Sequence, residues 1–266
     1  MPGAITLSSV WLATVVLLSL RLAAVFAMTP LLAAGSVPAT IRVLIVLGLA
    51  AALASGAPAE LSGLSIPPQL LSSPGLMIQA AFTELALGAT LALGILVAFA
   101  AFRMAGELPG IQMGLGLGQL LDPATNQAQT VVTSAFQQLG VLVFFLIDGH
   151  HALLRGLAYS LERFPLGRPW SLSAAAEPLL VQVMGLFSLA FALAVPVVFC
   201  LLLLEVALGV VARNMPQVNM IAMGIPVKIV VGIAALALWF VGMGDAMGRV
   251  YASIYRTWDS IFAGVG

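Results

Sequence analysis

The chain has 266 residues, of which 62% are apolar and only 8% carry charge, and its mean hydropathy is +1.14. An average globular domain has about 25% charged residues, so the composition excludes a soluble monomer, whose surface needs more charge than this chain supplies. Ten cationic side chains balance ten anionic ones, which argues against a nucleic-acid-binding protein with a basic face. We therefore expect a helical protein whose surface meets lipid, partner proteins or both.

Long apolar runs predict about six helices, because a membrane-spanning helix needs about 20 apolar residues. Prolines that follow Ser73, Asp122 and Glu177 mark three of the predicted helix starts. Loops rich in Pro, Ser and Gly are predicted over 55–75 and 162–178, and an amphipathic tail helix from 242. Apolar residues do not alternate over short segments, so strands are not expected. The predicted helices cover 10–28, the shorter 41–54, 74–102, 123–147, 178–204 and 218–241.

Four charged residues lie inside these apolar runs: Arg21, Glu84, Glu205 and Lys228. A charge at mid-bilayer costs about 2.5–3.5 kcal/mol on insertion scales, so each is expected to face a protein partner, a water-filled cavity or an opposite charge. The alternative, strongest for Arg21, is a side chain that reaches the interface from near a helix end.

Two prolines also lie inside apolar runs, and each removes a backbone N–H and crowds the preceding turn. Pro196 and Pro226 are therefore predicted to break the fifth and sixth helices. Broken helices beside intramembrane charges are also typical of secondary transporters. A transporter for a small solute is therefore the alternative function.

The segment 106–118 contains five glycines and is the most distinctive stretch of the chain. A phosphate-binding loop is disfavoured, because no strand precedes it and no Gly-Lys-Ser/Thr follows. A packing seam is possible, since Gly110, Gly114 and Gly118 repeat every four residues. A mobile apolar loop is equally compatible, and Met113 suits a deformable seal. The spacing alone does not decide between seam and loop.

Catalytic and metal-binding patterns are not found, so no catalytic, cofactor or metal site and no enzymatic activity are expected. Asp148, His150 and His151 form the one chemical-looking cluster, but two imidazoles and one carboxylate are too few to indicate a metal site. An intramembrane hydrolase acting through these residues is a third and weaker hypothesis. Cys200 lies alone in an apolar run, which excludes an intramolecular disulfide and does not favour a nucleophile.

Motifs spread in order over nearly the whole chain resemble the FliR/SctT family, the R-type subunits of the type III secretion export gate. The stretch 103–124 is the most specific of them. The motifs are Arg21 with Thr29-Pro30 and Val37-Pro38, Ala98 to Glu107, Gly110 to Leu115, Asp122-Pro123-Ala124, Gly149-His150, Phe164 to Gly167, Ala207-Leu208-Gly209 with Arg213, Pro216-Gln217 and Gly224-Ile225-Pro226.

The resemblance implies an all-α fold in which a P-subunit-like helical part, residues 1–178, is fused to a Q-subunit-like helical hairpin within 179–266. It also implies that a plug loop of about 106–122 closes a channel, which favours the loop interpretation of the glycines. We call its centre, residues 110–118, the plug segment. The plug residues are Gly110, Ile111, Gln112, Met113, Gly114, Leu115, Gly116, Leu117 and Gly118.

The resemblance further implies a non-enzymatic subunit that exports unfolded flagellar proteins without a cofactor. Its partners would be the P-type and Q-type gate subunits and the B-type export-switch subunit. Its place would be the bacterial inner membrane at the flagellar basal body, with the assembled gate largely on the periplasmic side. The polar residues expected between helices or between subunits are Arg21, Glu84, Arg103, Glu107, Glu205, Arg213 and Lys228.

Overall fold

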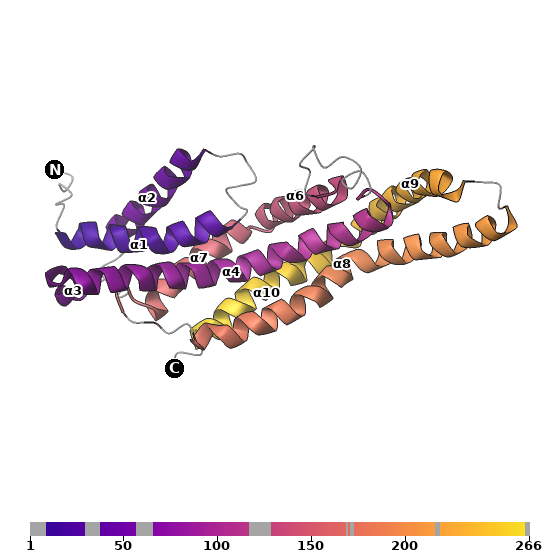
Figure 1. Cartoon of the computed structure of the whole chain (residues 1–266). Coiled ribbons are helices and arrows are strands. Elements are labelled where there is room, and N and C mark those ends of the chain that lie inside the picture. The colour runs from indigo at the N-terminus through magenta and orange to yellow at the C-terminus, as the bar shows by residue number, and fades with distance from the viewer. Residues whose placement is uncertain are drawn as a thin grey trace. The chain divides into compact units, whose positions relative to one another are not determined.

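A computed structural model describes residues 9–29, 38–56, 66–116, 129–168, 170, 173–215 and 219–263. Over these residues the prediction of an all-α fold is confirmed, since they form helices and no strand (Figure 1). The helices are α1 (Ser9–Met28), α2 (Ala39–Gly56), α3 (Pro68–Ser72), α4 (Pro74–Gln112), α6 (Val131–Leu146), α7 (Gly149–Arg163), α8 (Ser173–Asn214), α9 (Met220–Phe240) and α10 (Gly244–Ala263).

Most differences from the predicted helices concern where they begin and end. α4 begins at Pro74 as predicted but extends over 39 residues to Gln112. α6 begins at Val131, where the Thr130 side chain accepts a hydrogen bond from the Thr133 N–H; the start predicted at Asp122-Pro123 lies outside the described residues. α8 begins at Ser173, ahead of the predicted start, and the short α3 lies in the predicted loop 55–75.

The predicted breaks at Pro196 and Pro226 are wrong, because α8 and α9 continue through both residues. A proline removes one hydrogen bond from a helix, and neighbouring contacts hold the remaining turns in register. The break that the structure does show lies between α6 and α7, which are bent by 71°. Asp148 stands at this bend with a φ of 57°, a left-handed conformation that is uncommon for residues other than glycine.

Four of the described helices are long and apolar enough to cross a membrane: α1, α4, α8 and α9. A fifth span results if the bent pair α6 and α7 counts as one. α2, predicted from 41–54, is a shorter apolar helix. The described chain therefore offers four or five candidate spans, against about six predicted apolar helices.

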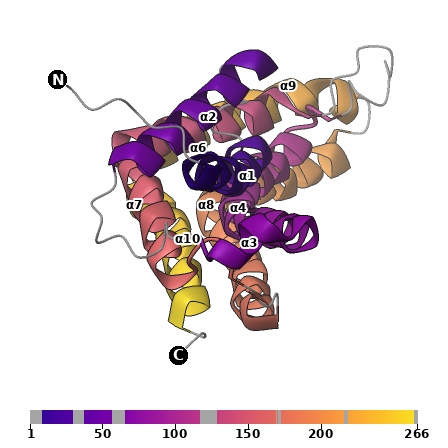
Figure 2. The same cartoon turned by 90° about the vertical axis from the view of Figure 1, so that its left-hand side faces the viewer.

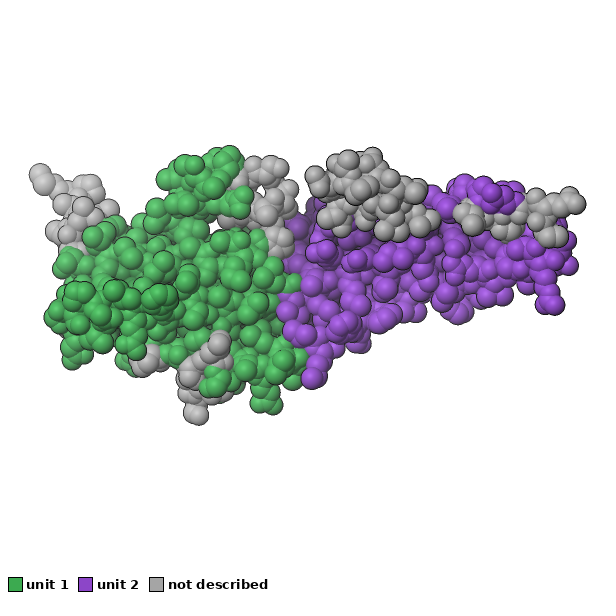
Figure 3. Space-filling model, in the orientation of Figure 1, with its two compact units in different colours: residues 1–96, 148–182, 254–266 green, residues 97–147, 183–253 purple. Residues whose placement is uncertain are grey.

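The chain forms two compact units (Figure 3), to both of which α4, α8 and α10 contribute. Unit 1 comprises residues 1–96, 148–182 and 254–266, and unit 2 comprises 97–147 and 183–253. The division after residue 178 that the family resemblance implies stays a prediction.

The core of unit 1 joins α1, the first half of α4, α7 and the end of α10. α7 and α10 run side by side (Figure 2), and the indole of Trp258 on α10 fits over Gly156 of α7. The Trp258 Nε1–H donates a 3.2 Å hydrogen bond to the Leu91 carbonyl of α4. This buried indole therefore fastens three helices to one another.

The core of unit 2 is an aromatic cluster formed by Phe99, Phe102, Phe144 and Tyr251, with ring centroids 5.4–6.3 Å apart. The Tyr251 hydroxyl donates a hydrogen bond to the Gly140 carbonyl of α6. Aromatic pairs at these distances add about 0.5–1.5 kcal/mol each to the effect of burial. The cluster therefore holds α6 against α4 and α10 within unit 2.

Candidate functional site

Unit 1 contains a deeply buried ion pair between Arg21 of α1 and Glu84 of α4. Both side chains are 1% exposed, and the Arg21 Nε lies 2.7 Å from the Glu84 Oε2. A buried guanidinium without a partner would be very costly, and the carboxylate supplies the opposite charge. The structure thus brings together two of the sequence-predicted polar residues, which lie 63 positions apart.

Three backbone groups complete this network. Arg21 donates to the Ser160 carbonyl at 3.1 Å and to the Phe164 carbonyl at 2.8 Å, while the Gly167 N–H donates to the Glu84 Oε1 at 3.1 Å. Ser160 also accepts through its hydroxyl, at 3.2 Å. The pair therefore fixes the C-terminal end of α7 and the turn that follows it.

The plug segment begins as helix, because α4 continues to Gln112. Two glycines allow α4 to pack closely on α6 within unit 2. A Cβ added at Gly106 would lie 2.8 Å from the Thr133 Cα, and one at Gly110 would lie 2.4 Å from the Thr130 Oγ1. The glycines are thus required for the approach of two helices, so a packing seam exists at Gly106 and Gly110.

The helix ends within the plug segment in a Schellman motif. The Leu115 N–H donates to the Gly110 carbonyl at 3.1 Å and the Gly114 N–H to the Ile111 carbonyl at 2.9 Å. Gly114 adopts a φ of 81°, which favours glycine at this position. Met113 is fully buried and Ile111 is 59% exposed. Residues 115 and 116 continue as a turn, and Leu117 and Gly118 lie outside the described residues.

The other predicted polar residues lie on unit 2. Lys228 of α9 donates a hydrogen bond to Glu205 of α8, and the two side chains are 23% and 39% exposed. This pair joins the two helices of the apolar hairpin. Arg103, Glu107 and Arg213 are exposed on α4 and at the end of α8.

The cluster at the start of α7 lies on the surface of unit 1. Asp148, His150 and His151 have ligand atoms within 4.8 Å of one another, and the Asp148 Oδ1 lies 3.3 Å from the His151 Nδ1. Tyr255 donates to the nearby Gly149 carbonyl at 3.3 Å. Burial raises the pKa of the Tyr255 phenol, which keeps it a neutral donor. The Asp148 and His151 side chains are 74% and 62% exposed, so the cluster is well hydrated.

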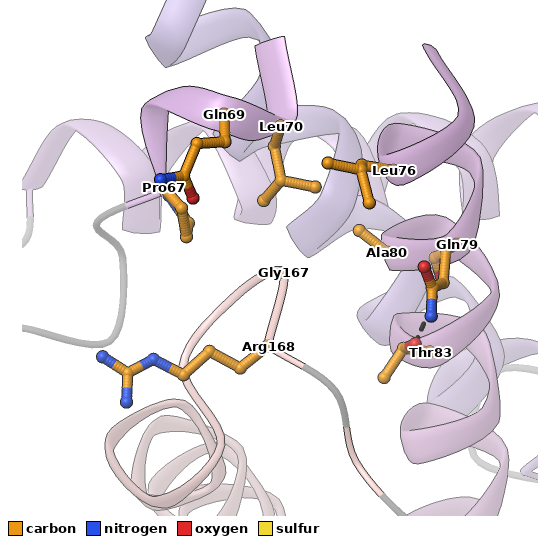
Figure 4. A pocket seen from close by; sticks show the side chains of 9 residues that line it. All are labelled: Pro67, Gln69, Leu70, Leu76, Gln79, Ala80, Thr83, Gly167 and Arg168. Carbon is orange, nitrogen blue, oxygen red and sulfur yellow. Dashed lines mark hydrogen bonds between the residues drawn. The ribbon is translucent and has the colours of Figure 1, made fainter. Parts of the chain in front are cut away.

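A cavity of about 340 Å³ opens in unit 1 between α3, the first turns of α4 and the turn at Gly167 (Figure 4). Leu70, Leu76 and Ala80 line one side, and Gly167 and Arg168 lie across from them. The Thr83 hydroxyl in its wall is already bonded to the Gln79 carbonyl at 2.9 Å. The cavity has an apolar floor and a single cation at its edge.

The sequence does not reveal the residues that contact the predicted polar residues and the plug segment. Ser160 and Phe164 act through their carbonyls, which carry no residue-specific signal. Gly88 and Gly232 lie where a neighbouring helix or side chain comes close to the backbone. An isolated glycine inside a helical pattern is the signal that could have pointed to these contacts.

The fold and these polar groups define an all-helical protein of membrane-spanning composition, with ion pairs between its helices and a glycine-capped segment inside unit 2. The family model described as "Bacterial export proteins, family 1" matches residues 12–254. The chain belongs to this family.

Individual relatives agree with this family match. The flagellar biosynthetic protein FliR of Escherichia coli K12 is 31% identical over 218 residues, which is 82% of this chain and 80% of the relative. FliR of Bacillus subtilis is 28% identical over 253 residues, or 94% and 95% of the two chains. The surface presentation of antigens protein SpaR of Shigella flexneri is 29% identical over 147 residues, or 55% and 57%.

Proposed function

We propose that this chain is a non-enzymatic subunit of the flagellar type III protein-export gate. It forms part of the channel for unfolded flagellar proteins, and the plug segment closes that channel until substrate passes. The family match over residues 12–254 and the FliR relatives support a place in the flagellar export apparatus.

The observation that carries the plug proposal is the way the segment is attached. A 39-residue helix, α4, supplies a rigid arm, and the Schellman motif at Gly114 ends it. From Gly110 to Gly118 the segment carries no charge, and its four glycines are interspersed with large, mostly apolar side chains. A short apolar segment of this kind can seal a narrow channel and still yield to a passing chain, because its glycines allow many backbone conformations.

The partners we propose are the P-type and Q-type gate subunits and the B-type export-switch subunit, in the bacterial inner membrane at the flagellar basal body. The assembled gate would lie largely on the periplasmic side. Apolar side chains that stay exposed on α8 and α9 are compatible with such an assembly. Energy for export would come from other components.

The transporter alternative loses the observation that suggested it. Secondary transporters bind solutes where helices are interrupted near the membrane centre. Here α8 and α9 continue through Pro196 and Pro226, and Glu205 and Lys228 are bonded to each other. No interrupted helix therefore stands beside these charges.

Deleting residues 115–118 tests the plug. The deletion spares the buried Met113 and the left-handed Gly114, and the backbone N–H of the residue that then follows Gly114 can replace that of Leu115 in the cap, so assembly with the partner subunits should persist. We expect the closed gate to conduct ions, measured in planar bilayers with the purified complex and no substrate. A matched deletion of residues 60–63, in the predicted loop, should leave conductance unchanged. If the 115–118 deletion assembles and its conductance equals that of the control, the plug proposal is wrong.

A further inference from the structure

Met113 is seated in a gap on α9 that only glycine leaves open. Its side chain is fully buried, and a Cβ added at Gly232 would lie 2.3 Å from the Met113 Cε, 2.8 Å from its Cγ and 2.9 Å from its Sδ. Any other residue at 232 would collide with three atoms of this side chain. We call Gly232 the notch for Met113.

The backbone around Met113 gives this contact a fixed geometry. Met113 is the last residue before the left-handed Gly114, and the Met113 N–H donates to the Pro109 carbonyl at 2.9 Å. The neighbouring Ile111 points to the surface. Within the described part of the plug segment, Met113 is thus a side chain that anchors it to α9.

The residue next to the seated Met113 contributes an unfavourable interaction. The Gln112 Oε1 is buried and has no hydrogen-bond donor among the described residues. A buried acceptor without a donor opposes the state that buries it. Burial of the thioether chain and the cost of this oxygen therefore act in opposite directions, which suits a contact that must form and release.

An ion pair between the helices of the hairpin lies close to the notch. Lys228 lies four residues before Gly232, on the same side of α9, and it is bonded to Glu205 of α8. The notch thus lies about one helical turn from the ion pair that joins α8 to α9.

We propose that Met113 seated in the Gly232 notch is the latch that holds the plug segment closed. This inference rests on the proposed function and deepens it, because it assigns the closing contact to one side chain and one glycine. Opening would require Met113 to leave the notch, and movement of α9 relative to α4 would release it.

Substitutions at both sides of the contact test the latch in the purified gate with its partner subunits. Gly232→Ala should raise the substrate-free open fraction roughly ten- to a hundred-fold, because Met113 loses its buried seat. Gly224→Ala is the matched control on α9, since among the described residues a Cβ there would meet only the Leu208 Cδ1, at 3.7 Å. Adding Gly232→Ala to Met113→Ala should cause no further rise, since the shorter side chain no longer collides.

A reversible crosslink tests the same contact in the opposite direction. The cysteines are introduced by Met113→Cys and Gly232→Cys, with Cys200→Ser to remove the free thiol, because a Cβ at 232 would lie 2.8 Å from the Met113 Cγ, the atom that a cysteine sulfur replaces. Oxidation should lower both export and ion conductance, and a reductant should restore them. Failure to crosslink in the closed gate, or unchanged export after crosslinking, would overturn the latch.

The outcomes separate the latch from the plug itself. If deleting residues 115–118 opens the gate while Gly232→Ala behaves like Gly224→Ala, the plug proposal holds and the latch is wrong. If the deletion leaves conductance unchanged, the proposed function fails and the latch fails with it. If the double variant Gly232→Ala with Met113→Ala leaks as much as the sum of the leaks of the two single variants, the effect of Gly232→Ala is not transmitted through Met113.

Discussion

Arg21 directs its guanidinium to two carbonyl groups at the C-terminal end of α7. The Ser160 carbonyl also accepts the Phe164 N–H at 2.9 Å, whereas the Phe164 carbonyl belongs to the residue that caps the helix, where carbonyls lack partners within the helix. A cation there also interacts favourably with the helix dipole. The fork-shaped guanidinium reaches Glu84 at the same time, which a lysine ammonium could not do with the same geometry.

Removing this cation should be among the most destabilising single changes in unit 1. Arg21→Leu leaves the buried Glu84 carboxylate uncompensated, so the free energy of unfolding should fall by about 3–5 kcal/mol. Adding Glu84→Leu should recover part of the loss, because no unpaired charge remains. Urea denaturation in detergent measures both, with the exposed Arg249→Leu as a control that should change stability by about 0.5 kcal/mol at most. A single variant as stable as this control would contradict the network.

The sequence indicates which charged residues are unusual, but it does not indicate which groups they contact. Arg21, Glu84, Glu205 and Lys228 were conspicuous because each interrupts an apolar run. Which charge meets which depends on helix packing between residues 23 or 63 positions apart. Composition alone has no information on that packing.

At some glycines, neighbouring helices lie closer together than a larger residue would allow. At Gly88 a Cβ would lie 2.4 Å from the Arg21 carbonyl oxygen and 2.8 Å from the Ala24 Cβ. The first of these atoms is backbone, so it cannot turn aside as the end of a side chain can. α1 and α4 must separate if this glycine is replaced.

Gly88→Ala should therefore lower the free energy of unfolding by about 1–3 kcal/mol, the usual cost of overpacking. Gly48→Ala on α2 is its matched control, since no atom lies within 4 Å of a Cβ there. That variant should gain up to about 1 kcal/mol from helix propensity. Thermal unfolding of the two variants should thus shift in opposite directions, and a shift of the same sign would disprove the close approach.

Element types were largely predictable and element ends were not. The glycines of 106–118 predict a poor helix, yet α4 continues through Gly106 and Gly110 because packing on α6 requires them. Tertiary contacts override propensity here. The same holds at Pro196 and Pro226, where neighbouring turns maintain helices that local rules predict to break.

For the molecule as a whole, the decisive quantity is the apolar surface that the chain does not bury itself. Only 28% of an apolar 18-residue stretch of α8, and only 11% of such a stretch of α9, is buried inside the chain. Leu238 and Val230 are 81% and 69% exposed. Composition predicts that such a surface avoids water, but lipid tails and partner subunits satisfy this requirement equally well.

The half-exposed pair of Glu205 and Lys228 can distinguish lipid from protein around this hairpin. Exchanging the charges, with Glu205→Lys and Lys228→Glu together, preserves an opposite pair between α8 and α9 but reverses the field that it presents outward. Lipid tails would tolerate the exchange, whereas a partner subunit with complementary polar groups would not. Because we propose protein contacts here, co-purification of the partner subunits should fall on the order of tenfold, the effect of about 1.4 kcal/mol.

The neutral double variant Glu205→Gln with Lys228→Met serves as the comparison. It removes both charges and therefore any repulsion between the exchanged charges and a partner subunit. It should retain more of the partner subunits than the exchanged pair does. Unfolding measurements on the isolated chain should show that both doubles keep the fold. If the exchanged pair co-purifies with its partners as well as the unmodified chain does, this part of the hairpin faces lipid. The charges then act only between α8 and α9, because lipid tails carry no groups that could sense the reversal.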